Sequence, residues 1–136
     1  MKVVLDTNVL VSGLLNPYGA PGSVLRLVAA GLVTVCHDAR ILGEYEAVLL
    51  RATFGFRPAE VRDLLALIRT DGEAALAKPL GHALPDPSDA PFLEVAVAAR
   101  AACLVTGNAR HYPFRARNRV RVLAPGPFLA FFATSR

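Results

Sequence analysis

No acidic residue follows Glu94 in this chain of 136 residues, although seven arginines do. The first 94 residues hold all 11 acids and eight of the 15 basic residues, so their net charge is −3, whereas the last 42 residues carry +7. An acidic part and a basic part within one domain are typical of a metal site beside a binding track for a polyanion. The other interpretation is a basic surface that only contacts solvent.

The sequence also has only two cysteines and no long apolar run. Cys36 and Cys103 lack the paired spacing of a zinc site and lie in apolar segments, which favours buried, reduced thiols over a disulfide. The longest uncharged stretch, residues 7–25, contains asparagine, proline and glycine and is a poor membrane span. Asp6 interrupts the N-terminal apolar run too early for a secretory signal. We therefore expect a cytoplasmic protein that makes no contact with a membrane.

Hydrophobic residues make up 54% of the chain, which is enough for the core of a single domain spanning residues 1–136. Short β-branched segments predict buried strands, and they alternate with segments of helical periodicity. Strands are predicted at residues 2–5, 32–36, 77–80, 103–106 and 120–123, and helices at residues 23–30, 38–49, 58–68, 86–101 and from residue 125 or 127. The alternation predicts an α/β fold, a three-layer α/β/α sandwich with a mostly parallel sheet.

Carboxylates stand where the elements of this fold would begin or end. Asp6 follows the first predicted strand, where it is either a ligand at the carboxyl edge of the sheet or a helix cap. Glu44 and Glu46 flank the apolar stripe of one predicted helix, and helical geometry does not choose between them. Asp86 and Asp89 stand at a predicted helix start, where one can cap and the other can bind a cation.

Three carboxylates that converge from separate elements would repel one another, and a divalent cation would compensate the repulsion. Oxygen ligands favour Mg²⁺ or Mn²⁺ over zinc. Such ions lower the pKa of a bound water and neutralise charge on a phosphodiester. The carboxylates therefore predict hydrolysis of a phosphate ester.

Four segments, in this order, resemble the PIN-domain family, in particular the VapC-type toxin components of prokaryotic toxin–antitoxin systems: VVLDTNVLVSGL, ILGEYEAVL, LPDPSDAPFLEVAVAARA and CLVTGNARHYP. The resemblance implies a PIN-like fold and a Mg²⁺- or Mn²⁺-dependent endoribonuclease that cleaves RNA and is neutralised by an antitoxin protein. It assigns catalytic and metal-binding roles to Asp6, Glu44 and Asp89, and thereby selects Glu44 over Glu46. The supporting positions that it implies are Asn8, Ser12, Asp86, Thr106 and Asn108.

The chain departs from the family pattern at the fourth acid, which is expected in or just after the Thr-Gly turn. Asn108 occupies this place, and His111 follows three residues later. The amide oxygen of Asn108 could still bind a metal, and His111 could contact a phosphate; the other interpretation of His111 is a turn or surface residue. We therefore expect a second metal to bind weakly, or only together with a substrate phosphate.

Arginines alternate with other residues from Arg115 to Val122. If this segment is extended, four guanidinium groups share one face, where they could follow an RNA backbone or bind an acidic antitoxin tail. Otherwise it is an edge strand kept soluble by charge. The residues predicted to contact nucleic acid are Arg110, His111, Arg115, Arg117, Arg119 and Arg121. A mean hydropathy of +0.41 also favours a buried interface, such as that of a homodimer.

Two other classes of function share some of these features. An RNA-binding or regulatory module could keep the PIN-like fold with weak or no catalysis, since one acid is missing. A phosphatase or a phosphoreceiver domain also places an aspartate after its first strand. However, haloacid-dehalogenase-like phosphatases use a second aspartate where this chain has Asn8, and receiver domains need a lysine near the fifth strand, whereas no lysine follows Lys78.

Overall fold

Five parallel strands form the central sheet of the computed structural model, which describes residues 1–135. The strands are β1 (Lys2–Leu5), β2 (Thr34–His37), β3 (Glu73–Ala74), β4 (Cys103–Val105) and β5 (Val122–Leu123). Their order across the sheet is β3-β2-β1-β4-β5. Because β1 pairs in parallel with β2 on one side and with β4 on the other, the predicted α/β fold is confirmed.

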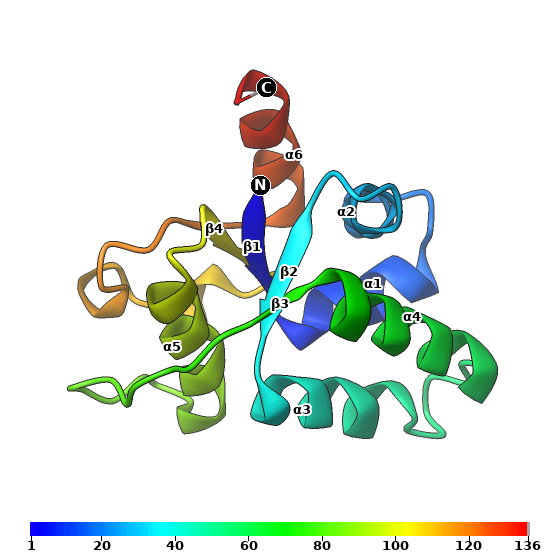
Figure 1. Cartoon of the computed structure of the whole chain (residues 1–136), viewed down its shortest axis with the longest axis horizontal. Coiled ribbons are helices and arrows are strands. Elements are labelled where there is room, and N and C mark those ends of the chain that lie inside the picture. The colour runs from blue at the N-terminus through cyan, green and yellow to red at the C-terminus, as the bar shows by residue number, and fades with distance from the viewer. Residues whose placement is uncertain (136) are drawn as a thin grey trace.

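Six α-helices surround the sheet in the described part of the chain. They are α1 (Thr7–Leu15), α2 (Ala20–Ala29), α3 (Ala39–Leu49), α4 (Pro58–Asp71), α5 (Ala90–Ala99) and α6 (Pro125–Thr134). From β1, the chain adds β2 and then β3 on one side of β1. It then returns through α5 and adds β4 on the other side of β1. Right-handed crossovers then put α5 on the opposite face from α1, α2 and α4, and Figure 1 shows them on either side of β1 and β2.

Helix α3 lies across the carboxyl ends of the strands, at the bottom of Figure 1. It packs against α1 and α5. The side chains of Ile41, Tyr45 and Leu49 are buried at the helical spacing that predicted this helix. Its N-cap is Asp38, whose side chain accepts a hydrogen bond from the backbone N–H of Ile41 at 3.0 Å. Because α3 lies across this edge, its polar side chains Glu44 and Tyr45 reach the carboxyl end of β1.

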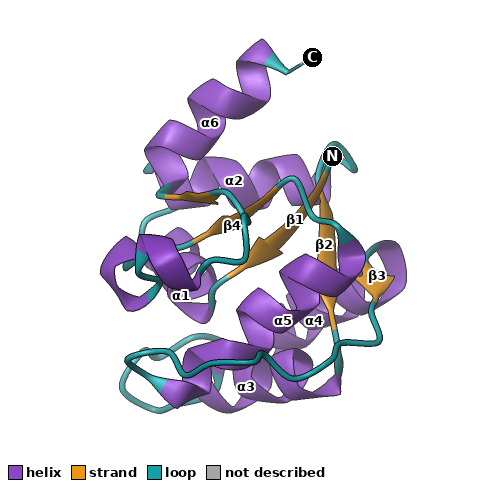
Figure 2. Ribbon diagram, turned by 90° about the vertical axis from the view of Figure 1, so that its left-hand side faces the viewer, coloured by secondary structure: helices purple, strands orange, loops and turns teal. Residues whose placement is uncertain are grey.

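The core lies around β1, whose residues Val3, Val4 and Leu5 are completely buried. Cys36 and Cys103 are buried and unpaired, as predicted. Helix α6 projects beyond the amino ends of the strands, at the opposite end of the molecule from α3 (Figures 1 and 2). None of the helices in residues 1–135 combines the length and the apolar character needed to cross a membrane.

Three predictions about local structure were wrong. Residues 77–80 form no strand; β3 forms earlier, at Glu73–Ala74, because these residues meet the open edge of β2. Helix α2 begins at Ala20 and not at residue 23, since Pro21 is well placed in a first helical turn. The arginine-rich segment 115–122 is not extended: it contains a 3₁₀ turn at Phe114–Ala116, and only Val122 lies in a strand.

Candidate metal centre

Asp6 follows β1 directly and is buried at the carboxyl edge of the sheet. Asp6 stands at the N-cap position of α1, but its side chain makes none of the hydrogen bonds that cap a helix start. Instead, its Oδ2 accepts hydrogen bonds from the hydroxyl of Thr106 at 2.8 Å and from the hydroxyl of Tyr112 at 3.2 Å. Burial raises the pKa of Asp6 above its ordinary value, although both hydrogen bonds act in the opposite direction.

Thr106 joins the end of β4 to Asp6. It is completely buried, and its hydroxyl accepts hydrogen bonds from the backbone N–H of Asn108 at 3.0 Å and from the amide of Asn8 at 3.4 Å. The amide oxygen of Asn8 accepts in turn from the backbone N–H of Gly107 at 2.8 Å. These contacts connect the carboxyl ends of β1 and β4. The order in which the chain adds strands reverses between β1 and β4, and ligands commonly bind at such a point of a parallel sheet.

Glu44 is brought to the same edge by α3. Its half-buried side chain accepts a hydrogen bond from the hydroxyl of Thr7, the first residue of α1. The neighbouring Tyr45 anchors the helix, because its buried hydroxyl donates to the backbone carbonyl at the end of β1 at 2.5 Å. Glu46 is exposed. The geometry thus brings Glu44 into the cluster and leaves Glu46 outside it.

Asp86 and Asp89 lie on the 3₁₀ turn η1 (Pro87–Asp89), directly before α5. Asp86 is the N-cap of this turn and its Oδ1 accepts from the backbone N–H and the hydroxyl of Ser88, at 3.0 and 2.8 Å, so the predicted capping role is confirmed. The carboxylate of Asp89 is buried and lies 3.1 Å from Nδ1 of His111. One ligand atom from each of Asp86, Asp89 and His111 lies within 4.8 Å of the other two.

The two aspartates of η1 have opposite pKa shifts. Burial, together with repulsion by Asp6 and Asp86, raises the pKa of Asp89 to about 6, and the favourable contact with His111 offsets only part of this increase. The pKa of Asp86 is lowered because Ser88 donates hydrogen bonds to its charged form. The metal-free site thus holds a buried carboxylate whose negative charge is disfavoured.

A family model described as PIN domain matches residues 2–110, a range that contains Asp6, Glu44 and Asp89. The chain belongs to the PIN-domain family. PIN domains have a nuclease-type fold and are generally nucleases that depend on divalent metals. Among curated proteins, none matches the chain.

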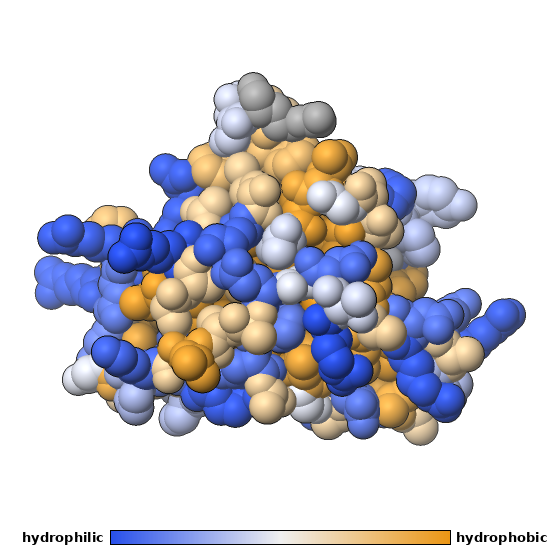
Figure 3. All heavy atoms as spheres, viewed as in Figure 1, coloured by the Kyte–Doolittle hydropathy of each residue, from blue (hydrophilic) through white to orange (hydrophobic). Residues whose placement is uncertain are grey.

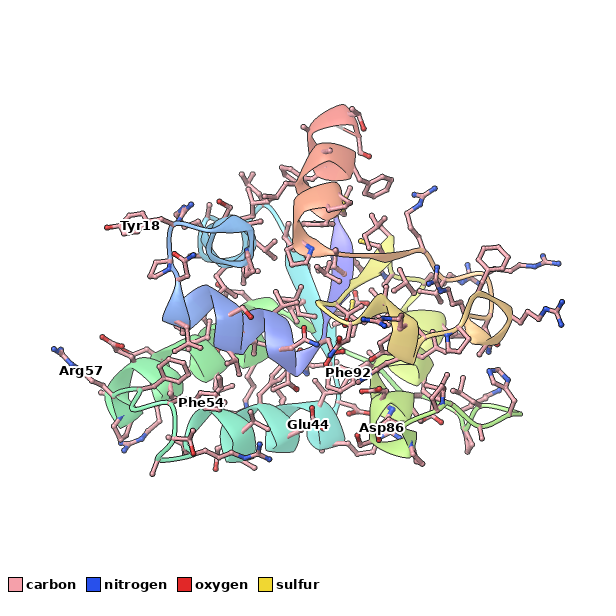
Figure 4. All side chains as sticks on the ribbon, turned by 180° about the vertical axis from the view of Figure 1, so that it is seen from behind. Tyr18, Glu44, Phe54, Arg57, Asp86 and Phe92 are labelled. Atoms are coloured by element: carbon pink, nitrogen blue, oxygen red, sulfur yellow. The ribbon has the colours of Figure 1, made fainter. Side chains whose placement is uncertain are left out.

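The carboxylates of this PIN domain fit a divalent cation. Asp6, Glu44 and Asp89 come from three separate elements, and Figure 4 shows Glu44 on α3 and Asp86 before α5 at the same end of the molecule. The charge on Asp6 disfavours ionisation of Asp89, and a bound cation would relieve this repulsion. Carboxylate oxygens are the ligands that Mg²⁺ and Mn²⁺ prefer. Asp6, Glu44 and Asp89 would hold such an ion.

Two predicted supporting residues are less closely connected to the cluster. Ser12 is exposed on α1 and makes no side-chain hydrogen bond to the acids within residues 1–135. Asn108 is exposed, and it contacts Thr106 through its backbone N–H and not through its amide. The side chain at the place of the fourth acid therefore does not contribute to the network that orients Asp6.

The arginines predicted to contact nucleic acid divide into two groups. The side chain of Arg117 donates to the backbone carbonyl of Tyr112 at 2.7 Å, and the guanidinium of Arg121 lies over the ring of Phe131, 4.4 Å from its centroid. The other side chains are exposed and have no ion pair or hydrogen bond to the rest of the described chain. They belong to Arg110, Arg115 and Arg119. Figure 3 shows hydrophilic side chains projecting on the left, where Figure 1 places this segment.

Sequence reasoning missed two hydroxyl groups that orient the acids, those of Thr7 and Tyr112. Thr7 stands next to Asp6, and a threonine after a strand-end aspartate is a signal that could have indicated it. Tyr112 follows the last residue of the turn η2 (Ala109–His111), and its burial has no local signature, because it depends on packing against residues about 106 positions earlier.

Proposed function

We propose that this PIN domain is a Mg²⁺- or Mn²⁺-dependent endoribonuclease. The observation that carries the proposal is the convergence of Asp6, Glu44 and Asp89 at the carboxyl edge of the sheet, with hydroxyl donors holding the first two. A bound cation would offset charge on the phosphodiester and lower the pKa of the attacking water. Asp6, Glu44 and Asp89 would hold the cation, and Glu44 would also orient the attacking water at the same edge.

The exposed arginines support a polyanionic substrate. Arg110 follows the Thr-Gly turn beside the acids, and Arg115 and Arg119 lie further along the same segment with no partner in the described chain. Such side chains bind phosphates without reading bases, so they would position an RNA strand across the acidic edge. Arg117 would instead position Tyr112, because it holds the backbone carbonyl of that residue. The acids would then perform the cleavage.

Cleavage of a labelled single-stranded RNA by the metal-free protein, before and after addition of Mg²⁺ or Mn²⁺, tests the proposal. Replacing Asp6 or Glu44 with Asn or Gln, respectively, is expected to lower the rate by about 100-fold or more, as for other losses of transition-state charge stabilisation. Glu46→Gln is the matched control on the same helix and is expected to leave the rate within about twofold. RNA binding without any metal-dependent cleavage would support a non-catalytic module, and a stable phosphoaspartate after incubation with a phosphoryl donor would support the phosphatase class.

The arginines can be tested by the salt dependence of RNA binding to the Asp6→Asn protein, which leaves the substrate intact. A plot of log K against log salt has a negative slope. Removing one arginine that binds a phosphate of a single strand decreases the magnitude of this slope by about 0.7. We expect this decrease for Arg115→Ala and Arg119→Ala. Arg57→Ala is the control, because Figure 4 shows Arg57 at the far end of the molecule from the segment 114–122. An equal decrease for Arg57→Ala would mean that binding is not local.

We also propose that the nuclease acts as the toxin of a toxin–antitoxin pair, on the basis of the resemblance of its motifs to VapC-type toxins. The partner would be an antitoxin with an acidic tail that competes with RNA for the basic segment 110–121. Induced expression is expected to arrest growth, and Asp6→Asn is expected to abolish the arrest. Growth arrest by Asp6→Asn equal to that of the unmodified protein would refute a toxic role of RNA cleavage.

A further inference from the structure

Phe114 is an aromatic side chain that the fold leaves outside the core. It begins the 3₁₀ turn at Phe114–Ala116, and 85% of its surface is exposed. The guanidinium of Arg117 lies over one face of the ring, 5.8 Å from its centroid, so the exposed surface includes the opposite face. A ring with one open face can stack with another flat group.

The ring of Phe114 forms part of the wall of a cavity of about 720 Å³, which we call the Phe114 cavity. Arg115 and Arg119 line the same cavity, and neither side chain has an ion pair or hydrogen bond to the rest of the described chain. Sites for small ligands commonly have volumes of roughly 300–1,000 Å³. The Phe114 cavity therefore offers a flat apolar surface beside two unpaired cations.

The Phe114 cavity is connected to the candidate metal centre through Tyr112. The side chain of Arg117, which covers one face of the ring, donates to the backbone carbonyl of Tyr112 at 2.7 Å. The hydroxyl of Tyr112 donates in turn to Asp6 at 3.2 Å. Because Phe114 follows Tyr112 by two residues, their Cα atoms lie at most about 7 Å apart. A strand cleaved at the acids would therefore pass close to the ring.

We propose that the Phe114 cavity is a subsite for an unpaired nucleobase, which stacks on the open face of Phe114 while Arg115 and Arg119 bind the adjacent phosphates. The inference rests on the proposed ribonuclease function and states how the substrate of that function is held. Every base has a flat π-face, so stacking on an aromatic side chain binds single strands without selecting their sequence. An acidic polypeptide would satisfy the arginines but would leave the ring without a flat partner, so the ring favours RNA.

Fluorescence anisotropy of a labelled single-stranded RNA, bound to the full chain in EDTA, tests the subsite without any cleavage. Phe114→Leu is expected to weaken RNA binding about tenfold, the effect of losing one stacked base, and Phe114→Trp is expected to keep the affinity. Tyr18→Leu is the matched control, because Tyr18 is a 92% exposed aromatic residue that Figure 4 shows far from the segment 114–122. Circular dichroism verifies that each variant is folded.

A fully abasic strand of the same length separates stacking from charge, because it keeps the phosphates and lacks the bases. We expect it to bind the unmodified protein at least about tenfold more weakly than the complete RNA. Phe114→Leu should then bind the abasic strand within about twofold of the unmodified protein, since no base is left to stack. Arg115→Ala, in contrast, is expected to weaken binding of both strands.

The outcomes distinguish the subsite from the proposed nuclease function. If Phe114→Leu binds the complete RNA as the unmodified protein does, or weakens binding of both strands equally, the subsite is refuted even where metal-dependent cleavage persists. A loss confined to the complete RNA would support the subsite even if no metal gave cleavage, in which case the proposed function alone would fail. Binding of poly-glutamate that is tighter than RNA binding and depends on Phe114 would identify a docking site for an acidic protein and overturn the proposal.

Discussion

Replacing Asp89 with asparagine is expected to stabilise the metal-free protein while it abolishes metal-dependent cleavage. Only 7% of the surface of Asp89 is exposed, and burial together with the charges of Asp6 and Asp86 raises its pKa from 3.8 to about 6. At pH 7.5 the folded protein therefore keeps a carboxylate charged in surroundings that disfavour the charge. Asparagine has nearly the same shape and no charge.

The magnitude follows from the linkage between proton binding and folding. A shift of about two pH units corresponds to about 3 kcal/mol at 1.36 kcal/mol per unit. The substitution also weakens the contact with His111, so we expect a net gain of about 1–2 kcal/mol at pH 7.5, or about 4–8 °C in Tm. Because the pKa is raised in the folded state, the folded protein takes up a proton between about pH 6 and pH 4 that the unfolded chain does not. The metal-free protein therefore becomes more stable as the pH falls through this range.

Thermal unfolding in EDTA from pH 4 to pH 8, followed by circular dichroism, measures both effects. The slope between pH 4 and pH 6 is expected to be shallower in Asp89→Asn, where the raised pKa of Asp6 still contributes, than in the unmodified protein. The control Asp63→Asn, which changes an exposed aspartate of α4, is expected to keep the slope of the unmodified protein. Metal at 100 times its Kd would stabilise the unmodified protein by about 2.7 kcal/mol and reverse the order. If metal-free Asp89→Asn is less stable at pH 7.5 and has the same slope as the unmodified protein, the electrostatic account of Asp89 is wrong.

Four further substitutions test two side chains and two glycines. Tyr112→Phe removes a hydroxyl donor to Asp6 and is expected to weaken metal binding about tenfold in calorimetry, with stability changed by less than about 1 kcal/mol. The buried carboxylate of Glu94 accepts hydrogen bonds from the guanidinium of Arg40 on α3 at 2.6 Å and from the backbone N–H of Leu80 at 2.9 Å. Glu94→Gln removes its charge and should lower the free energy of unfolding in urea by about 2 kcal/mol. Gly22→Ala forces a Cβ against the backbone carbonyl of Pro17 and should lower stability by about 2 kcal/mol or more, whereas Gly43→Ala, with open space around it on α3, should raise it by about 0.5–1 kcal/mol.

Local pattern predicted α3 but not α1, and the reason lies in their sequences. The apolar residues of α3 recur at helical spacing among charged residues, so the buried side is visible from the sequence alone. Helix α1, with the sequence TNVLVSGLL, has no charged residue to mark an exposed side. Its helical state depends on packing against α2 and α3, which no local pattern reports.

The arginine-rich segment 115–122 shows the opposite failure, a local pattern that tertiary structure overrides. Alternation of arginines is compatible with a strand, yet Asn118 and Arg119 adopt positive φ values of 50° and 65°. The contact of Arg117 with the carbonyl of Tyr112 and the position of Arg121 over Phe131 fold the segment into a loop. These partners are identified only when the chain has folded.

The sequence by itself determined which acids stand at the ends of elements, because Asp6 follows a buried strand and Asp89 precedes a helix, and both positions are local properties of the chain. Only the tertiary structure decided what these acids contact. Thr106 and Tyr112 reach Asp6 across 100 and 106 residues, and His111 reaches Asp89 across 22. Such contacts depend on how β1, β4 and α5 pack together, and side-chain packing between distant segments leaves no periodic trace in the sequence.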